Sequence, residues 1–239
     1  MGVWRWIGDA ASSGAGAVGA LLEKAGGLIG VPDPKTRRQV AFSVALIALA
    51  AKMAKADGIV TDSEVAAFRS IFSVPAEQQQ NVTRLFNLAR KDVAGFKSYA
   101  ARVASLYADD SGALVDVVDG LFAIAKADGA VHEAELVYLE RVAEIFGIHG
   151  AAFEQIAARH VIGPEGDPYA ILGVDRDWPL NEIRAQYLKL VAENHPDTFI
   201  ARGLPPDFIA IANDRLAAIN GAWERVQSEL RPATRPGVP

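Results

Sequence analysis

The sequence predicts an all-α protein, and three observations support this fold class. Between Lys35 and Ile148 the chain is rich in alanine, and its apolar residues recur every three or four positions, as on one face of a helix. The same stretch contains no alternating valine and threonine runs and no Asn-Gly dipeptide, which are the usual signs of strands and hairpins. Residues 167–230 show the same helical spacing. We therefore expect two helical regions in succession.

The composition excludes several classes of function. The 239 residues are 51% hydrophobic and 22% charged, which is typical of a globular protein with one large or two small domains. Because the chain has no cysteine, it cannot form a disulfide scaffold, a thiolate nucleophile, a zinc knuckle or an iron–sulfur site. The net charge of −5, without a block of lysine and arginine, argues against nucleic acid as the main ligand.

Residues 1–34 form an arm rich in glycine and alanine. Its first 30 residues hold eight of the 21 glycines, and its larger apolar residues fall near helical spacing. Two interpretations remain: a flexible arm with a few docked residues, or a loose amphipathic segment on a membrane surface. Gly14–Gly19 satisfies the pattern G-x-G-x-x-G, but no strand precedes it, so we expect no nucleotide site.

No segment of the sequence is typical of a membrane-spanning helix. The longest uncharged runs, Ala10–Leu22 and Gln39–Ala51, have 13 residues each. A spanning helix needs about 20 apolar residues. Met1–Leu22 does not show a signal-peptide pattern either. The expected location is cytoplasmic, with contact between residues 1–30 and the inner membrane peripheral at most.

The spacing of apolar residues predicts the helices of the first region, residues 35–148, one by one. Proline, glycine and polar residues at Pro75, Asp92, Ser111 and Gly147 mark their boundaries. The predicted helices span 36–56, 62–72, 76–90, 92–107, 111–127 and 133–146. A connector over 149–166, itself helical at about 150–162, leads to the second region.

An internal repeat predicts that the first region has two related halves. The segment Ala54–Glu64 recurs 71 residues later as Ala125–Glu135, with seven of 11 positions identical. Such a repeat indicates two similar helical units packed around a pseudo-two-fold axis. Together with its alanine-rich helices and Lys-Ala-Asp-Gly turns, this region resembles the tellurite-resistance TerB-like family over residues 36–148. That resemblance implies metal or partner binding at the acidic turns, without a settled activity.

The repeated motif Asp-Gly-x-Val-x-x-x-Glu matches the second half of a calcium-binding loop. It makes Asp57, Glu64, Asp128 and Glu135 the candidate ligands of a divalent cation. The first half of such a loop is missing, and a hard cation needs about six to eight oxygen ligands. We therefore prefer a structural interpretation, in which Asp-Gly ends one helix and a capping box opens the next.

The second region predicts an antiparallel helical hairpin. In its first helix Ile183, Tyr187 and Leu190 share one face, and in its second helix Leu216, Ile219, Trp223 and Val226 do the same. We expect these faces to pack against Tyr169 and Leu172. Because a proline disfavours helical geometry in the residue before it, His195-Pro196-Asp197 is expected in the exposed loop after the first helix.

Three features of this hairpin resemble the DnaJ-type J domain over residues 167–231. They are the motif Tyr-x-Ile-Leu-Gly-Val, the 26-residue step from Tyr169 to His195, and the segment Ala218–Val226. A TerB-like domain followed by a J domain is similar to the DjlA-like subfamily. Residues 232–239 have little apolar content to bury and are expected to be disordered.

The J-domain resemblance implies a co-chaperone rather than an enzyme. It implies binding to a heat shock protein 70 chaperone of the DnaK type and stimulation of its ATP hydrolysis through His195, Pro196 and Asp197. Arg184 and Lys189 are the flanking cations that would help binding. The chain has four histidines, and the spacing of its residues shows no Ser-His-Asp arrangement, so the sequence does not favour an enzyme. No cofactor is implied beyond the possible divalent cation.

An alternative is a TerB-like interaction or metal-binding stress-response protein whose J domain is degenerate or masked. The outer face of the first hairpin helix, where the family usually has lysine and arginine, carries Ala185, Leu188 and Ala192. Such a face indicates either a weak J domain or one covered by the TerB-like domain or the N-terminal arm.

Overall fold

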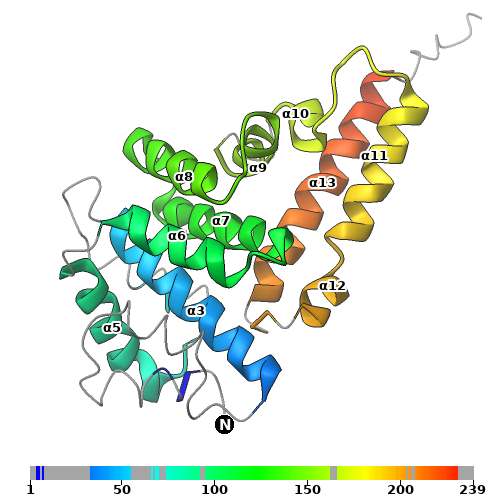
Figure 1. Cartoon of the computed structure of the whole chain (residues 1–239). Coiled ribbons are helices and arrows are strands. Elements are labelled where there is room, and N and C mark those ends of the chain that lie inside the picture. Colours follow the sequence, from blue (N-terminus) through cyan, green and yellow to red (C-terminus); the bar gives the residue numbers. More distant parts are fainter. Residues whose placement is uncertain are drawn as a thin grey trace, which may run out of the picture.

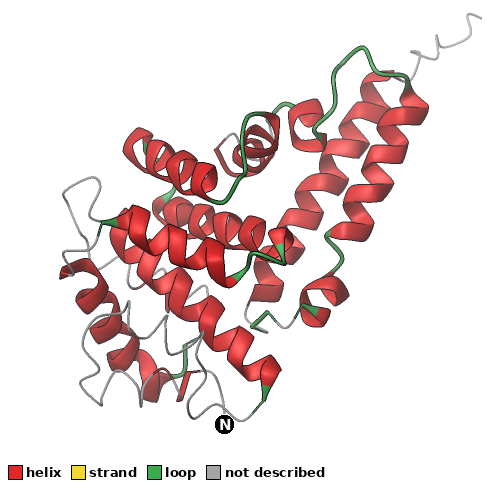
Figure 2. Cartoon of the chain, viewed as in Figure 1, coloured by secondary structure: helices red, strands yellow, loops and turns green. Residues whose placement is uncertain are grey.

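The computed structural model confirms the all-α fold class, since every regular element that it describes is a helix (Figure 2). It describes residues 4–5, 7, 33–54, 66, 68–69, 74–91, 95–161, 166–202, 204–205 and 208–230. Among these residues, no helix is both long enough and apolar enough to cross a membrane. The glycine pattern at 14–19, most of the helix predicted over 62–72, and the predicted disordered tail lie outside the described residues.

The elements follow the predicted boundaries to within a few residues in the first region. They are α3 (Pro34–Met53), η1 (Ala76–Gln78), α5 (Gln79–Lys91), α6 (Phe96–Leu106), α7 (Ser111–Ala125), η2 (Lys126–Asp128), α8 (Glu133–Ile145) and α9 (Ala151–Val161). The second region contains α10 (Pro168–Leu172), α11 (Leu180–Glu193), α12 (Pro196–Ala201) and α13 (Ile209–Leu230).

Helix α3 is the central element of the first region. The Asp33 side chain opens it by accepting a hydrogen bond of 2.9 Å from Thr36 N, and Pro34 occupies the first turn. Every residue from Val40 to Met53 is buried. A helix that is apolar on all sides must be surrounded, and α3 contacts α5, α6, α7 and α8 (Figure 1).

The helix expected as a connector, α9, is part of the same hydrophobic core. Its residues Phe153 and Ile156 are buried there, and Phe122 of α7 lies 5.9 Å from Phe153 between ring centroids. The reason is its amphipathic spacing, which provides an apolar face that the α7 surface covers. Residues 151–161 therefore add a layer to the first region rather than only linking it to the second.

The hairpin of α11 and α13 has the predicted pairing of faces. Ile183, Leu190 and Ile219 are buried, and the rings of Tyr187 and Trp223 stack with centroids 5.0 Å apart. Tyr169 and Leu172 of α10 close this second core, as expected. Leu216 differs from the prediction, because the buried face of α13 runs through Ile211, Arg215 and Ile219 and leaves Leu216 half-buried.

The two regions share a core at the N-terminal part of α13. This helix of 22 residues is about 33 Å long, so it extends from the first core to the far end of the hairpin, where α11 begins (Figure 1). Phe208 lies 5.0 Å from Phe42 of α3 between ring centroids. Gly120 of α7 makes room for it, because a methyl group there would meet the Phe208 ring at 3.0 Å. A bulkier residue at position 120 would push the two regions apart.

Candidate functional site

The His195-Pro196-Asp197 tripeptide lies where α11 ends and α12 begins. Asn194 closes α11 by donating a hydrogen bond of 2.7 Å from its side-chain amide to Leu190 O. His195 is the N-cap of α12, and its Nδ1 accepts a hydrogen bond of 3.3 Å from Asp197 N. The expectation of a loop is therefore wrong in part: Pro196 and Asp197 form the first turn of α12. A proline fits that position because its fixed φ suits a first turn and its missing N–H would have no partner there.

The two ionisable side chains of the tripeptide face solvent. The exposed fraction is 54% for the His195 side chain and 85% for the Asp197 side chain. His195 Nδ1 and Asp197 Oδ2 are 3.5 Å apart. The Asp197 carboxylate is therefore accessible to a cation on another molecule.

The outer face of α11, beside the tripeptide, is exposed and low in charge. Leu188 has 51% of its surface exposed, and Ala185 and Ala192 are also exposed. Among the described residues, the TerB-like region does not cover this face, and most of the N-terminal arm, the other cover considered, lies outside those residues. Of the two flanking cations, Arg184 is exposed and Lys189 Nζ lies 3.9 Å from a Glu193 carboxylate oxygen.

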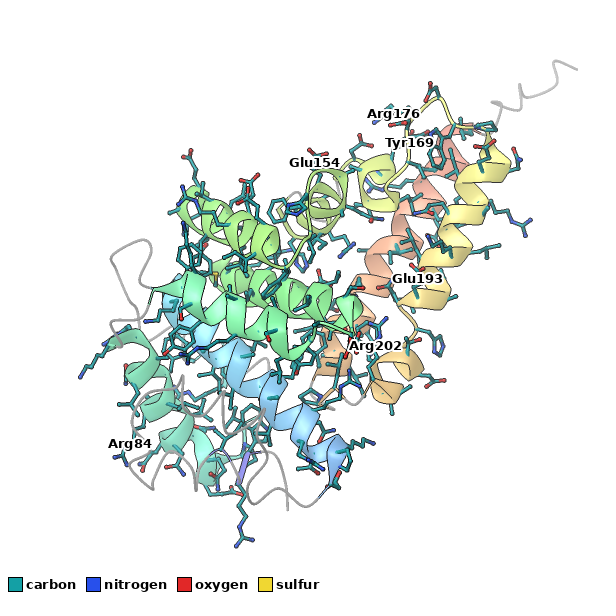
Figure 3. All side chains as sticks on the ribbon, viewed as in Figure 1. Arg84, Glu154, Tyr169, Arg176, Glu193 and Arg202 are labelled. Atoms are coloured by element: carbon teal, nitrogen blue, oxygen red, sulfur yellow. The ribbon has the colours of Figure 1, made fainter. Side chains whose placement is uncertain are left out.

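A buried ion cluster lies beneath the tripeptide, and its first acidic member is Asp116 of α7. This carboxylate has no exposed surface and accepts a hydrogen bond of 3.0 Å from Arg215 Nη2 and one of 3.2 Å from Arg202 Nη1. Arg202 is labelled in Figure 3. Burial raises the pKa of Asp116 to about 6, and the two guanidinium groups act against that shift. Asp116 thus joins α7 to α13 and to the residue that follows α12.

The second acidic member is Asp119, one helical turn further along α7. Its Oδ1 contacts Arg159 Nη2 at 3.1 Å and His160 Nε2 at 2.8 Å, and its Oδ2 pairs with Arg215 Nε. Burial alone would raise the pKa of Asp119, but Arg159, Arg215 and His160 outweigh it and hold that pKa well below its usual range. Asp119 is therefore ionised at neutral pH and joins α7 to α9 and α13.

Arg215 connects this cluster to the residue before the tripeptide. Its Nη1 donates a hydrogen bond of 2.9 Å to Asn194 Oδ1, and its guanidinium lies over the ring of Phe199, 5.1 Å from the centroid. The side chain is only 4% exposed. One arginine on α13 thus contacts α7, the α11–α12 junction and α12.

This cluster was not predicted from the sequence, although three of its members depart from a local pattern. Arg215 occupies a buried position on α13, four residues from both Ile211 and Ile219. Asp116 and Asp119 are three residues apart in a helix that is otherwise apolar. A charge within an apolar stripe is expensive to bury without a partner, so such residues signal a buried ion pair.

Of the four predicted cation ligands, Glu135 is the one whose side chain lies within the described residues. Asp57 and Glu64 lie outside those residues, and the structure describes only the backbone of Asp128. Glu135 is buried, and its Oε2 accepts a hydrogen bond of 2.9 Å from His132 N, as in a capping box. The described part of the chain contains no group of three or more histidine, aspartate or glutamate side chains placed to hold a metal ion. The second copy of the repeat therefore fits the structural interpretation.

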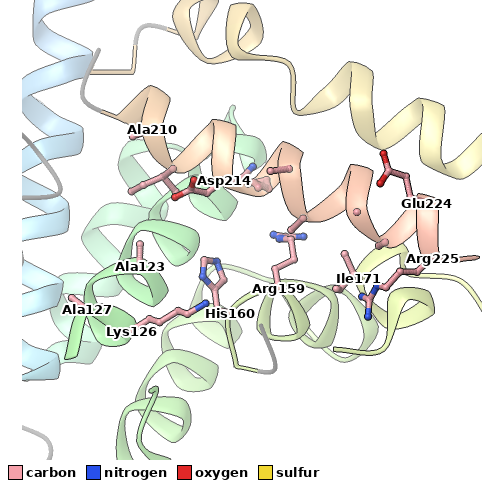
Figure 4. A pocket seen from close by; sticks show the side chains of 16 residues that line it. Ala123, Lys126, Ala127, Arg159, His160, Ile171, Ala210, Asp214, Glu224 and Arg225 are labelled. Atoms are coloured by element: carbon pink, nitrogen blue, oxygen red, sulfur yellow. The ribbon is translucent and has the colours of Figure 1, made fainter. Parts of the chain in front are cut away.

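A cleft of about 950 Å³ borders the ion cluster, between α7, α9, α10 and α13 (Figure 4). Arg159 and His160 line this cleft, together with the charged residues Lys126, Asp214 and Arg225. Much of the remaining lining is alanine and glycine from α7 and α13. Its charged groups are of both signs.

Comparisons with known proteins identify the family. The family model of the tellurite resistance protein TerB matches residues 43–158. A co-chaperone protein DjlA from Photobacterium profundum is 26% identical over 221 residues, covering 80% of this chain and 79% of the relative. The chain belongs to the DjlA-like co-chaperone family.

Two further relatives of this DjlA-like chain bear the same name. The co-chaperone protein DjlA of Legionella pneumophila is 24% identical over 226 residues, covering 79% of this chain and 76% of the relative. The one from Shewanella oneidensis is 32% identical over 117 residues, covering 44% of this chain and 45% of the relative. No solved structure matches the chain at a significant level.

The TerB match divides the ion cluster between two parts of the DjlA-like chain. Asp116 and Asp119 lie within the matched residues 43–158, whereas Arg202 and Arg215 lie beyond them. The cluster is therefore a contact between the TerB domain and the C-terminal helices.

Proposed function

We propose that this DjlA-like chain is a J-domain co-chaperone. Residues 167–231 form the J domain, which binds a DnaK-type chaperone in its ATP-bound state and stimulates ATP hydrolysis. The carrying observation is the exposed Asp197 carboxylate, presented next to His195 at the head of α12 in a hairpin that projects from the TerB domain. Its relatives' name, co-chaperone protein DjlA, supports the same assignment.

Each residue of the tripeptide has a distinct physical task in this proposal. Asp197 pairs with a cation of the partner, because its carboxylate is the most exposed charge of the three residues. His195 caps α12 and so orients the Asp197 backbone. Pro196 restricts the backbone between them, which reduces the entropy lost on binding.

The J domain performs no bond chemistry in this proposal, since the partner hydrolyses the ATP. It accelerates hydrolysis only if it binds the hydrolysis-competent state of the partner more tightly than the resting state. Arg184 and Lys189 are exposed cations on α11 that help attract an acidic partner surface, and Glu193, 3.9 Å from Lys189 Nζ, offsets part of that charge.

The test is the steady-state ATPase rate of a DnaK-type chaperone with the full chain, using Asp197→Asn and His195→Gln. We expect both variants to lose stimulation while helix content stays unchanged. Because the Asp197 side chain is exposed, we expect Asp197→Asn to change the free energy of unfolding by no more than about 0.5 kcal/mol. His195→Gln alters the N-cap of α12 and should cost no more than about 1 kcal/mol.

The matched control for these variants is Glu224→Gln, which neutralises an exposed carboxylate elsewhere on the hairpin. We expect it to stimulate as the wild type does. Stimulation by Asp197→Asn equal to that of the wild type would contradict the proposal. A wild-type chain without stimulation would favour the degenerate J domain.

A further inference from the structure

Arg215 is a buried arginine whose guanidinium group donates hydrogen bonds to two residues and forms an ion pair with a third. Nη1 donates to Asn194 Oδ1, Nη2 donates to Asp116 Oδ1, and Nε pairs with Asp119. Burying a charge is costly unless its hydrogen-bonding capacity is satisfied, so the position of each partner depends on the others. A planar, rigid guanidinium can hold three partners in one fixed arrangement, which a lysine ammonium on a flexible stem cannot do.

The ion cluster contacts the residue that immediately precedes the tripeptide in the sequence. Asn194 is adjacent to His195, and its side chain is used at both ends: the amide nitrogen donates to Leu190 O and the oxygen accepts from Arg215. The end of α11 and the entry to α12 are thereby fixed relative to α13.

The ion cluster also contacts residues that follow the tripeptide in the sequence. The Phe199 ring, two residues after Asp197, is buried and lies under the guanidinium groups of Arg215 and Arg202. Arg202, at the end of α12, donates to Asp116 Oδ2. Both flanks of the exposed tripeptide are therefore anchored to carboxylates of α7.

We propose that Arg215 is a positioning residue, through which Asp116 and Asp119 of the TerB domain set the geometry of the His195-Pro196-Asp197 tripeptide. This inference rests on the proposed function, because it concerns how the tripeptide is presented to the DnaK-type partner. The TerB domain is then part of the activating device. Its acidic pair acts without touching the partner, since both carboxylates have no exposed surface.

The decisive variant is Asn194→Ala, which cuts the link between the cluster and the tripeptide but leaves both ion pairs of Arg215 in place. The lost hydrogen bond joins Asn194 to the charged Arg215. We expect its loss to raise the half-maximal concentration of the chain for ATPase stimulation about tenfold. Asn194→Asp keeps an acceptor for Arg215, so it should remain within about twofold of the wild type. The assay is DnaK-type ATPase stimulation by the full chain.

The matched pair within the cluster is Arg215→Lys and Arg159→Lys. Each removes a guanidinium group that pairs with Asp119, but only Arg215 contacts Asn194. Amide hydrogen exchange gives a readout that a loss of stability alone would not produce. Arg215→Lys and Asn194→Ala should speed exchange at the amides of residues 195 and 197–199, while amides of α3 stay protected. Arg159→Lys should leave exchange at those four amides unchanged and retain stimulation.

The outcomes separate this inference from the function on which it rests. If the wild type stimulates, Asp197→Asn does not, and both Asn194→Ala and Arg215→Lys act as the wild type does, the positioning role is overturned and the co-chaperone function stands. If Arg159→Lys loses stimulation as fully as Arg215→Lys at an equal loss of stability, the positioning role is also overturned. If the wild type itself does not stimulate, both proposals fall.

Discussion

Replacing Phe199 by alanine should destabilise the TerB domain, although this residue lies only four positions after His195 in the C-terminal region. The ring is 1% exposed and belongs to the same core as α3 and α7, with its centroid 6.3 Å from that of Phe208. Truncating a buried phenylalanine to alanine costs about 3–5 kcal/mol, from lost burial and from the cavity that remains. The ring also lies under two guanidinium groups, so the upper part of that range is expected.

The measurement is urea unfolding of the full chain, followed by far-ultraviolet circular dichroism and by tryptophan fluorescence. Because Phe199 and Phe208 join the hairpin tip to the first core, the two signals should shift together in Phe199→Ala. The neighbouring Ile200 is 46% exposed, so Ile200→Ala serves as the matched control and should cost less than about 1 kcal/mol. A loss below about 1 kcal/mol for Phe199→Ala, or separate transitions in both proteins, would refute the shared core.

Three further predictions concern the ion cluster, the repeat and the outer face of α11. Burial raises the pKa of Asp116 from 3.8 to about 6, so protonation of this carboxyl stabilises the folded state. That stabilisation is fully present below pH 3.8 and is lost as the pH rises through about 6. The free energy of unfolding of Asp116→Asn should therefore rise relative to the wild type between pH 4 and 6 in urea titrations, and a constant difference would contradict this. Glu135→Ala removes the hydrogen bond to His132 N and should cost about 1 kcal/mol. That loss should be equal with and without millimolar magnesium or calcium, whereas a metal-dependent loss would favour the cation site. Ala185→Lys/Leu188→Lys should speed association with an acidic partner surface and make stimulation salt-sensitive, in contrast to Glu224→Gln. An unchanged association rate at low salt would exclude an acidic partner surface opposite this face.

The helices and the hairpin pairing are determined by local sequence. The three- and four-residue spacing on α3, α7 and α8 requires only that each helix has an apolar face, and it located those helices to within a few residues. The stacking of Tyr187 on Trp223 likewise follows from two amphipathic helices joined by a short link. The first turn of α12 is also a local feature: a residue before proline disfavours helical geometry, and proline favours the first position of a new helix, so α12 begins at Pro196.

Only the tertiary structure determines which residues the buried charges pair with. Arg215 contacts Asp116 across 99 residues of sequence, and Phe199 and Phe208 fill a gap beside α3 and α7. Nothing in the sequence around Arg215 identifies a carboxylate so far away, because an ion pair depends on distances in space that helical periodicity does not encode. The sequence by itself determined two helical regions and an exposed tripeptide. Long-range packing decided that the tripeptide is held by the acidic pair of the TerB domain, since only the folded chain brings those charges together.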